Sequence, residues 1–141
     1  VSVFNNAHTI AVYHDSRSIT TFRHTVSAIA EGKKAVVFPE HDADFNHILC
    51  EFQEKFVDVG KLCYKRTKQV PAFVPMYLAP DLKTAYFGKP LPYPIELGTE
   101  EARKAVCQYL TAEITRLAVE APPHTVVPYR NQPRKTYPRN I

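Results

Sequence analysis

An apolar run, Ala35-Val36-Val37-Phe38, stops at Pro39 and passes directly into the carboxylate of Glu40. Four consecutive apolar residues bounded by a proline are typical of a strand that is buried on both faces of a sheet. In open α/β sheets, ligands bind in the crevice beyond the carboxyl ends of such strands. The run therefore predicts a buried strand that delivers Glu40 into a crevice, and Glu40 is the leading candidate for a site residue.

The residues before this run predict the rest of a β-α-β unit. Residues 10–14 are typical of a short strand, and residues 16–32 are typical of a helix with one apolar face. The apolar positions of that helix are Ile19, Phe22, Val26 and Ile29. Asp15 or Ser16 can cap its first turn, and Gly32 can take the left-handed conformation that ends a helix. Because a connection of this length suits a right-handed parallel crossover, we expect an α/β fold with a mixed or mainly parallel sheet and flanking helices.

Downstream of Glu40, apolar residues at helical spacing predict a long helix that starts near Phe45 and passes through Gly60. The members of this series are Phe45, Ile48, Leu49, Phe52, Phe56, Val59 and Cys63. A helix interior tolerates a single glycine at a cost of about 1 kcal/mol, so Gly60 does not outweigh the series.

Two short strands and a final helix are predicted in the rest of the chain. Residues 72–78 resemble a strand but contain Pro75, which cannot donate a ladder hydrogen bond and so belongs at a sheet edge or at the start of the strand. Residues 84–87 predict a further strand. Thr99 begins the last helix, and Pro122 ends it. The predicted buried face of this helix comprises Ala102, Val106, Leu110, Ile114 and Leu117.

The net charge of +4 comes from the end of the chain. Residues 122–141 hold four basic residues, five prolines and no acidic residue, whereas the remaining 14 basic residues balance 14 acidic residues. We therefore divide the chain into an α/β portion, residues 1–121, and a proline-rich basic tail, residues 122–141. Basic tails can contact lipid or RNA phosphates, but most termini of this composition are solvated, and we expect no nucleic-acid partner.

The cysteine usage and the hydropathy of the chain indicate its compartment. Three cysteines without a Cys-x-x-Cys pair predict reduced thiols, as in a cytoplasmic protein. No stretch approaches the roughly 20 apolar residues of a membrane span, so we expect any membrane contact to be peripheral. With 141 residues and 45% hydrophobic content, the chain is long enough for one core.

Metal-binding and nucleophilic chemistry are both disfavoured around Glu40. The donor types there are His41, Asp42, Asp44, His47, Cys50 and Glu51. A calcium loop beginning at Asp42 would need glycine where His47 stands and glutamate where Gln53 stands. Cys50, close in sequence to Leu49 and Phe52, is predicted to be a small core residue and not a nucleophile. We therefore expect no metal site.

The segment Phe38-Pro39-Glu40 resembles the phenylalanine-proline-glutamate-glycine block of the glycerolipid acyltransferases, the lysophosphatidate and glycerol-phosphate acyltransferases. In that family, a helix and then a strand with a valine-proline pattern follow this block. Residues 70–76 resemble that strand, with one extra residue between the prolines. Arg17 is the nearest counterpart of an arginine block that the family carries before the preceding helix. The similarity spans residues 10–90.

The resemblance implies an enzyme that transfers an acyl group from a thioester to the hydroxyl of glycerol-phosphate or a lysophospholipid. The donor would be acyl-CoA or acyl carrier protein, and no other cofactor is implied. In the family, a histidine followed by an aspartate five positions later acts as general base. None of the six histidines of this chain has that aspartate, and His41 stands where the family usually has glycine.

Two interpretations follow from these residues. In the first, the chain is the C-terminal part of an acyltransferase-like domain, with the catalytic histidine and aspartate outside it, and is inactive alone. The resemblance then implies a substrate-binding set without a catalytic member, namely Glu40, Phe38, Pro39, Arg17 and His41. In the second, the chain is a non-enzymatic α/β binding module whose basic tail contacts lipid or RNA phosphates.

Overall fold

A computed structural model describes residue 10, residues 18–41 and residues 49–126 of the chain. Its regular elements are, in order, α2 (Ser18–Ala30), the 3-10 helix η1 (Glu54–Val57), α3 (Asp58–Thr67), β1 (Ala72–Phe73), β2 (Met76–Ala79), the 3-10 helix η2 (Pro80–Leu82), β3 (Thr84–Phe87), β4 (Leu91–Pro92) and α4 (Thr99–Glu120). The combination of helices with small sheets agrees with a mixed α/β class. The sheets are shorter than those expected from the sequence.

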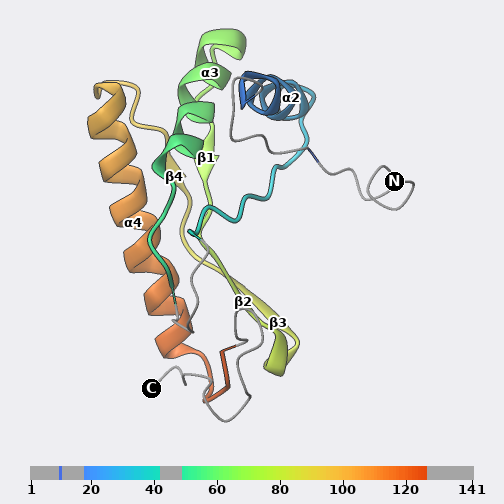
Figure 1. Cartoon of the computed structure of the whole chain (residues 1–141), viewed down its shortest axis with the longest axis vertical. Coiled ribbons are helices and arrows are strands. Elements are labelled where there is room, and N and C mark those ends of the chain that lie inside the picture. The colour runs from blue at the N-terminus through green and yellow to red at the C-terminus, as the bar shows by residue number, and fades with distance from the viewer. Residues whose placement is uncertain (1–9, 11–17, 42–48, 127–141) are drawn as a thin grey trace.

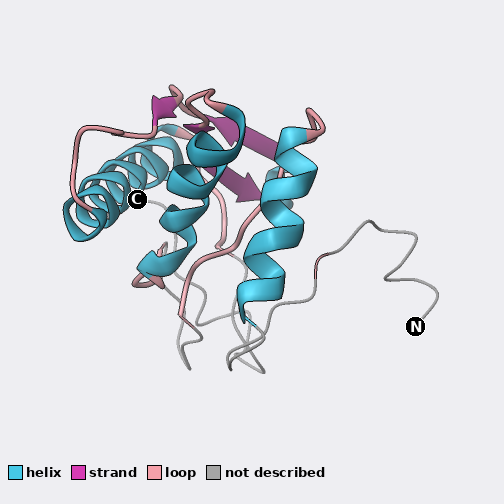
Figure 2. Cartoon of the chain, turned by 90° about the horizontal axis from the view of Figure 1, so that it is seen from above, coloured by secondary structure: helices cyan, strands magenta, loops and turns pink. Residues whose placement is uncertain are grey.

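The long helix α4 organises the described part of the molecule. It runs along one side, with α3 and α2 near its N-terminal end and the β2–β3 hairpin beside its C-terminal half (Figure 1). Seen from above, the three helices lie next to one another (Figure 2). One buried cluster centres on Tyr93 and Val106 and joins η1 to α4, and a second centres on Tyr77 and Leu117, between the hairpin and α4. The sequence therefore folds around the apolar face of α4.

The strand pairs of the described residues are antiparallel, so the prediction of a mainly parallel sheet is wrong for this part of the chain. β1 pairs with β4, and β2 pairs with β3 in a register that sets Met76 opposite Phe87. The turn between β2 and β3 is short and ends at Lys83, whose φ is +52°. A short turn reverses the chain and forces antiparallel pairing, whereas a parallel pair needs a crossover of a dozen residues or more.

The strand predicted from residues 72–78 is divided by Val74 and Pro75 into β1 and β2. Pro75 is fully buried, and its carbonyl oxygen accepts a hydrogen bond from the Gly88 N–H at 2.9 Å. The proline therefore lies at the junction of two strands, where no ladder donor is needed. The strand predicted at residues 84–87 is confirmed as β3.

The prediction of a buried strand at residues 35–38 is wrong. These residues are extended but belong to no strand, and the side chains of Val36 and Phe38 are 64% and 70% exposed. Only after Pro39 does the segment pair, through an antiparallel bridge between Glu40 and Phe52. An apolar run becomes a buried strand only where neighbouring strands supply its ladder and cover its faces.

The start of the helix predicted near Phe45 lies outside the described residues, which omit residues 42–48. Residues 49–53, which the prediction placed inside that helix, are not helical, and helical conformation follows in η1 and α3. Phe52 instead faces Glu40 in the bridge and is 7% exposed. The apolar character of Phe52 therefore reflects burial beside the bridge and not a helical face.

The predictions for where α2 and α4 end agree with the structure. α2 ends where expected, and Gly32 has a φ of +80°. α4 begins at Thr99, its Glu101 accepts the Gly98 N–H at 3.0 Å, and it ends before Pro122. Four of the five predicted core positions of α4 are buried, namely Ala102, Val106, Leu110 and Leu117. Sustained apolar spacing with both ends marked is a signal that tertiary contacts rarely override.

Candidate functional site

An apolar groove of about 860 Å³ lies between the extended residues 33–40 and residues 71–78. Side chains of α2, α3 and α4 complete its lining, including Val59 on α3 and Leu110 and Ile114 on α4. Most of its wall is aliphatic or aromatic. A groove of this size and composition fits an elongated apolar ligand, because ligand sites are concave and largely apolar with a few polar groups.

Charged side chains occur at the two ends of the extended wall of the groove. Lys33 and Lys34 begin that wall and Glu40 ends it. Glu40 follows Lys33 by seven positions and Lys34 by six. Lys33 Nζ lies 2.7 Å from Glu31 Oε2, and this contact lowers the pKa of the exposed Glu31 carboxyl. The groove thus has a basic end and an acidic end.

Glu40 is held in place by the backbone around it. Its Oε2 accepts a hydrogen bond from the Cys50 N–H at 2.9 Å. On either side, the His41 N–H donates to the Glu51 carbonyl and the Gln53 N–H donates to the Pro39 carbonyl, both at 2.8 Å. Glu40 is half-buried and lines the groove. Its carboxylate therefore has a structural contact and also a place in the wall of the groove.

The other predicted site residues differ in their positions. Phe38 and Pro39 line the groove directly before Glu40. His41 is exposed, and its backbone N–H is used in the bridge to Glu51. Arg17 lies outside the described residues. The structure thus brings together Phe38, Pro39 and Glu40, the three residues of the motif.

Cys63 and Cys107 are buried, whereas Cys50 is only partly buried and is not the core residue that the sequence predicted. Cys107 lines a second cavity of about 630 Å³ together with Cys50 and Thr111. Burial raises the pKa of the Cys107 thiol to about 11, with Glu54 as a smaller cause. A thiol with this pKa is protonated at neutral pH and is a poor nucleophile, because the thiolate is the reactive form.

Two further kinds of site are absent from the part of the chain that the structure describes. In residues 18–41 and 49–126, no three histidine, cysteine, aspartate or glutamate side chains are grouped as a metal ion would require. Within the same residues, no helix has both the length and the apolarity needed to cross a membrane. The donor cluster considered at residues 41–51 falls largely outside the described residues.

Sequence reasoning missed two parts of the groove. Lys33 and Lys34 follow the helix end at Gly32, and that position next to an apolar run was the only signal for them. Val126 lines the groove from the segment after α4, where it is 9% exposed. No local pattern indicates that placement, because it depends on the contact between Tyr77 and His124, which are 47 positions apart.

Comparison of the chain with known protein families, with curated proteins and with solved structures finds no match.

The geometry itself limits the chemistry that the site can perform. An apolar groove with a carboxylate at one end can bind an amphipathic molecule and orient a hydroxyl group by hydrogen bonding. No histidine is among the described residues that line the groove, and His41, which follows Glu40 in the sequence, is exposed.

Proposed function

We propose that this chain is the substrate-binding part of a glycerolipid acyltransferase-like domain, with the catalytic histidine and aspartate outside the chain. The groove binds the acyl chain, and Glu40 contributes to binding the polar acceptor, glycerol-phosphate or a lysophospholipid. The donor is an acyl thioester. The single observation that carries the proposal is that Phe38, Pro39 and Glu40, the residues of the acyltransferase-like motif, form one end of the apolar groove.

The size of the groove supports an acyl chain as the ligand. Burying each methylene group of such a chain is worth about 0.8 kcal/mol, so a groove of about 860 Å³ can supply most of the binding free energy without a buried polar contact. Phe73, Met76 and Ile114 provide flexible or aromatic surface along it. Affinity should therefore rise with acyl-chain length until the groove is filled.

The exposed apolar side chains around the groove support peripheral contact with a lipid surface. Phe38 and Phe87 line the groove and are 70% and 63% exposed. Lys33 and Lys34 lie in the same wall, and because Lys33 pairs with Glu31, Lys34 supplies the attraction of about 1 kcal/mol that a basic residue near a surface has for anionic lipids. A lipid could then pass between the membrane surface and the groove without crossing open water.

Calorimetric titration of the full chain with a long-chain lysophosphatidate tests the proposal. Val37→Asp introduces a charge into the wall of the groove and should weaken binding about tenfold or more, since an unpaired carboxylate opposes an apolar ligand. Val119→Asp is the matched control, because Val119 is similarly exposed but lies on α4 outside the groove. Equal binding by the two variants, or no binding by the native chain, would contradict the proposal.

The role of Glu40 is tested by comparing two ligands that differ in their polar ends. Glu40→Gln keeps an oxygen that can accept the Cys50 N–H, but it removes the charge. We expect weaker binding of the lysophosphatidate and unchanged binding of a fatty acid of the same length, because only the former carries acceptor hydroxyl groups. Equal losses for both ligands would assign Glu40 to the scaffold alone.

A further inference from the structure

A buried contact joins the segment after α4 to the β2–β3 hairpin. The Tyr77 hydroxyl oxygen lies 2.5 Å from Nε2 of His124, and the two ring centroids are 5.5 Å apart. On the other side of the imidazole, Nδ1 lies 2.8 Å from the Pro122 carbonyl oxygen. Tyr77 is 6% and His124 is 3% exposed. Two polar side chains thus meet in the core between elements far apart in the sequence.

The partners of the imidazole determine its tautomer. A carbonyl oxygen can only accept a hydrogen bond, so Nδ1 must carry the proton that points to Pro122. In the neutral ring Nε2 is then an acceptor, and the Tyr77 hydroxyl donates to it. Burial raises the pKa of Tyr77, which keeps this hydroxyl protonated. In the neutral form of His124, each hydrogen-bond donor of the two side chains therefore faces an acceptor.

We propose that the Tyr77–His124 contact is a pH-sensitive clasp, which holds residues 122–126 on the hairpin at neutral pH and releases them when His124 is protonated. In the imidazolium form both ring nitrogens are donors, so Nε2–H faces a hydroxyl group that was itself donating. The hydroxyl must turn, and a positive charge must be placed in a buried site. Imidazole is the side chain whose charge ordinarily changes between about pH 5 and pH 8.

Several titratable and charged side chains lie on the elements packed against the clasp. They are Tyr86 on β3, Asp81 and Lys83 in the hairpin turn, and Glu113, Arg116 and Glu120 on α4. Tyr86 stacks on Tyr77, with the ring centroids 6.5 Å apart. On α4, Arg116 pairs with Glu113 and with Glu120. Asp81 is exposed, and its Oδ2 accepts the Thr125 N–H at 3.4 Å. The contact between Asp81 and Thr125 lies within residues 122–126 and should be lost when these residues are released.

Release of the clasp would change the groove as well as the segment. Val126 lines the groove, and it follows His124 by two residues. Withdrawal of residues 122–126 would therefore uncover one part of the groove wall. The consequence for lipid binding rests on the proposed function, whereas the opening of the clasp does not.

Amide hydrogen exchange of the full chain, expressed as protection factors, tests the clasp without any ligand. Between about pH 7.5 and about pH 5.5, residues 124–126 should lose protection about tenfold or more, while α4 changes little. His124→Asn, which retains a donor near Nδ1 but cannot titrate, should abolish this dependence. The matched control is His24→Asn, at an exposed position of α2, which should respond like the native chain.

Two results would overturn the proposal: equal protection of residues 124–126 at both pH values in the native chain, or the same pH response in His124→Asn. If that variant does not fold, nitrogen-15 chemical shifts of the native imidazole decide the matter. The Nδ1–H tautomer at neutral pH supports the clasp, and the Nε2–H tautomer contradicts it. Because no lipid is present, failure of this test is distinct from failure of the lipid titration.

Discussion

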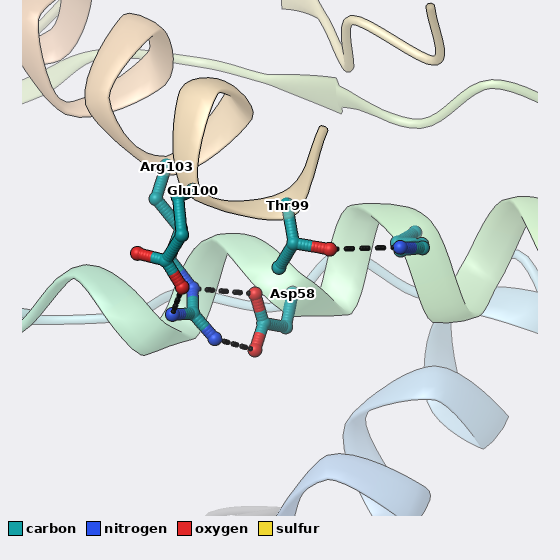
Figure 3. A network of polar contacts seen from close by, with 5 residues as sticks. Asp58, Thr99, Glu100 and Arg103 are labelled. Carbon is teal, nitrogen blue, oxygen red and sulfur yellow. Dashed lines mark hydrogen bonds and ion pairs between the residues drawn. The ribbon is translucent and has the colours of Figure 1, made fainter. Parts of the chain in front are cut away.

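The guanidinium of Arg103 on α4 holds the carboxylate of Asp58 at the start of α3 through two hydrogen bonds, Nε to Oδ1 at 2.9 Å and Nη2 to Oδ2 at 2.6 Å (Figure 3). Glu100, one turn earlier on α4, pairs with the same guanidinium. Lys61 adds a hydrogen bond to Thr99 at 2.8 Å. The first turns of the two helices are thus joined by polar contacts as well as by the core beneath them. The hydrogen bond to Asp58 is the main cause that raises the pKa of Arg103.

Replacing Arg103 by lysine should destabilise the fold although the charge is kept. Lysine cannot donate two hydrogen bonds in the planar arrangement of a guanidinium, and the pair is only about one-fifth exposed. We expect a loss of about 1 to 2 kcal/mol in the free energy of unfolding, measured by urea denaturation. Arg116→Lys on the same helix is the control, since the Arg116 side chain is 45% exposed against 17% for Arg103, and the loss should stay below about 0.5 kcal/mol. Equal losses would show that the contact with Asp58 contributes nothing specific.

Gly60→Ala should also destabilise the protein, in contrast to the usual effect of alanine in a helix. A methyl group at Gly60 would lie 2.7 Å from Cγ of Tyr93 and closer still to Cδ2. Tyr93 is 5% exposed and is fixed in the core, so the ring cannot withdraw freely. We expect a loss of about 1 to 3 kcal/mol, the range found for overpacked cores.

Gly32→Ala separates this steric effect from backbone strain. No atom lies within 4 Å of the position of its added methyl group, but the φ of Gly32 is +80°. The cost there should be about 1 kcal/mol and should come from the left-handed conformation alone. A stabilising Gly60→Ala substitution, detected as a higher denaturation midpoint, would refute the close packing of α3 on Tyr93.

Removing the carboxylate of Glu40 should loosen the loop that it contacts. In Glu40→Ala the partly buried Cys50 N–H loses its acceptor, and we expect a destabilisation of about 1 kcal/mol with faster exchange of that amide. Glu40→Gln should retain most of the stability. Glu51→Ala is the control for truncation of a glutamate side chain, because Glu51 is exposed and takes part in the bridge only through its backbone. If the glutamine variant lost as much stability as the alanine variant, charge and not hydrogen bonding would hold the loop.

The protein should lose stability between about pH 9 and pH 11 because of Cys107. Burial raises the pKa of this thiol from 9.0 to about 11, so between these values the unfolded chain has released a proton that the folded chain keeps. The free energy of unfolding therefore falls as the pH rises, by up to about 2 to 3 kcal/mol for such a shift. The stability that the protonated Cys107 thiol contributes is fully present below about pH 9. Cys107→Ala should remove this part of the alkaline loss in denaturation curves recorded at several pH values, and an unchanged loss would contradict the assignment.

The elements that could be predicted from the sequence are those whose signals are local. Thr99 and Pro122 mark the ends of α4, and its apolar positions recur from Ala102 to Leu117, so propensity, end signals and amphipathic spacing agree. For α2 the agreement holds at the C-terminal end, where Gly32 takes the left-handed conformation without strain, whereas Ile19 of the predicted apolar face is 66% exposed. Interactions between residues close together in the sequence were sufficient to predict these elements.

The candidate site was predicted only in part. Glu40 lines a groove, but Pro39 does not end the segment before it, because pairing with Phe52 begins at Glu40. The strand assignment failed because a ladder needs a partner, and residues 35–38 have exposed side chains in place of neighbours on both faces. The prediction that Phe52 is helical failed for a related reason, since its pairing with Glu40 closes a loop that no short window of sequence contains.

The amino-acid sequence by itself determined where α2 and α4 end, which face of α4 is buried and which short motif carries the acyltransferase-like resemblance. Only the tertiary structure decided that the strands pair antiparallel, that the motif lies beside a groove, and that His124 meets Tyr77. The physical reason is the range of the interactions. Helical hydrogen bonds and caps join residues within about one turn, whereas strand pairing, groove walls and buried polar contacts join residues whose proximity depends on the whole fold.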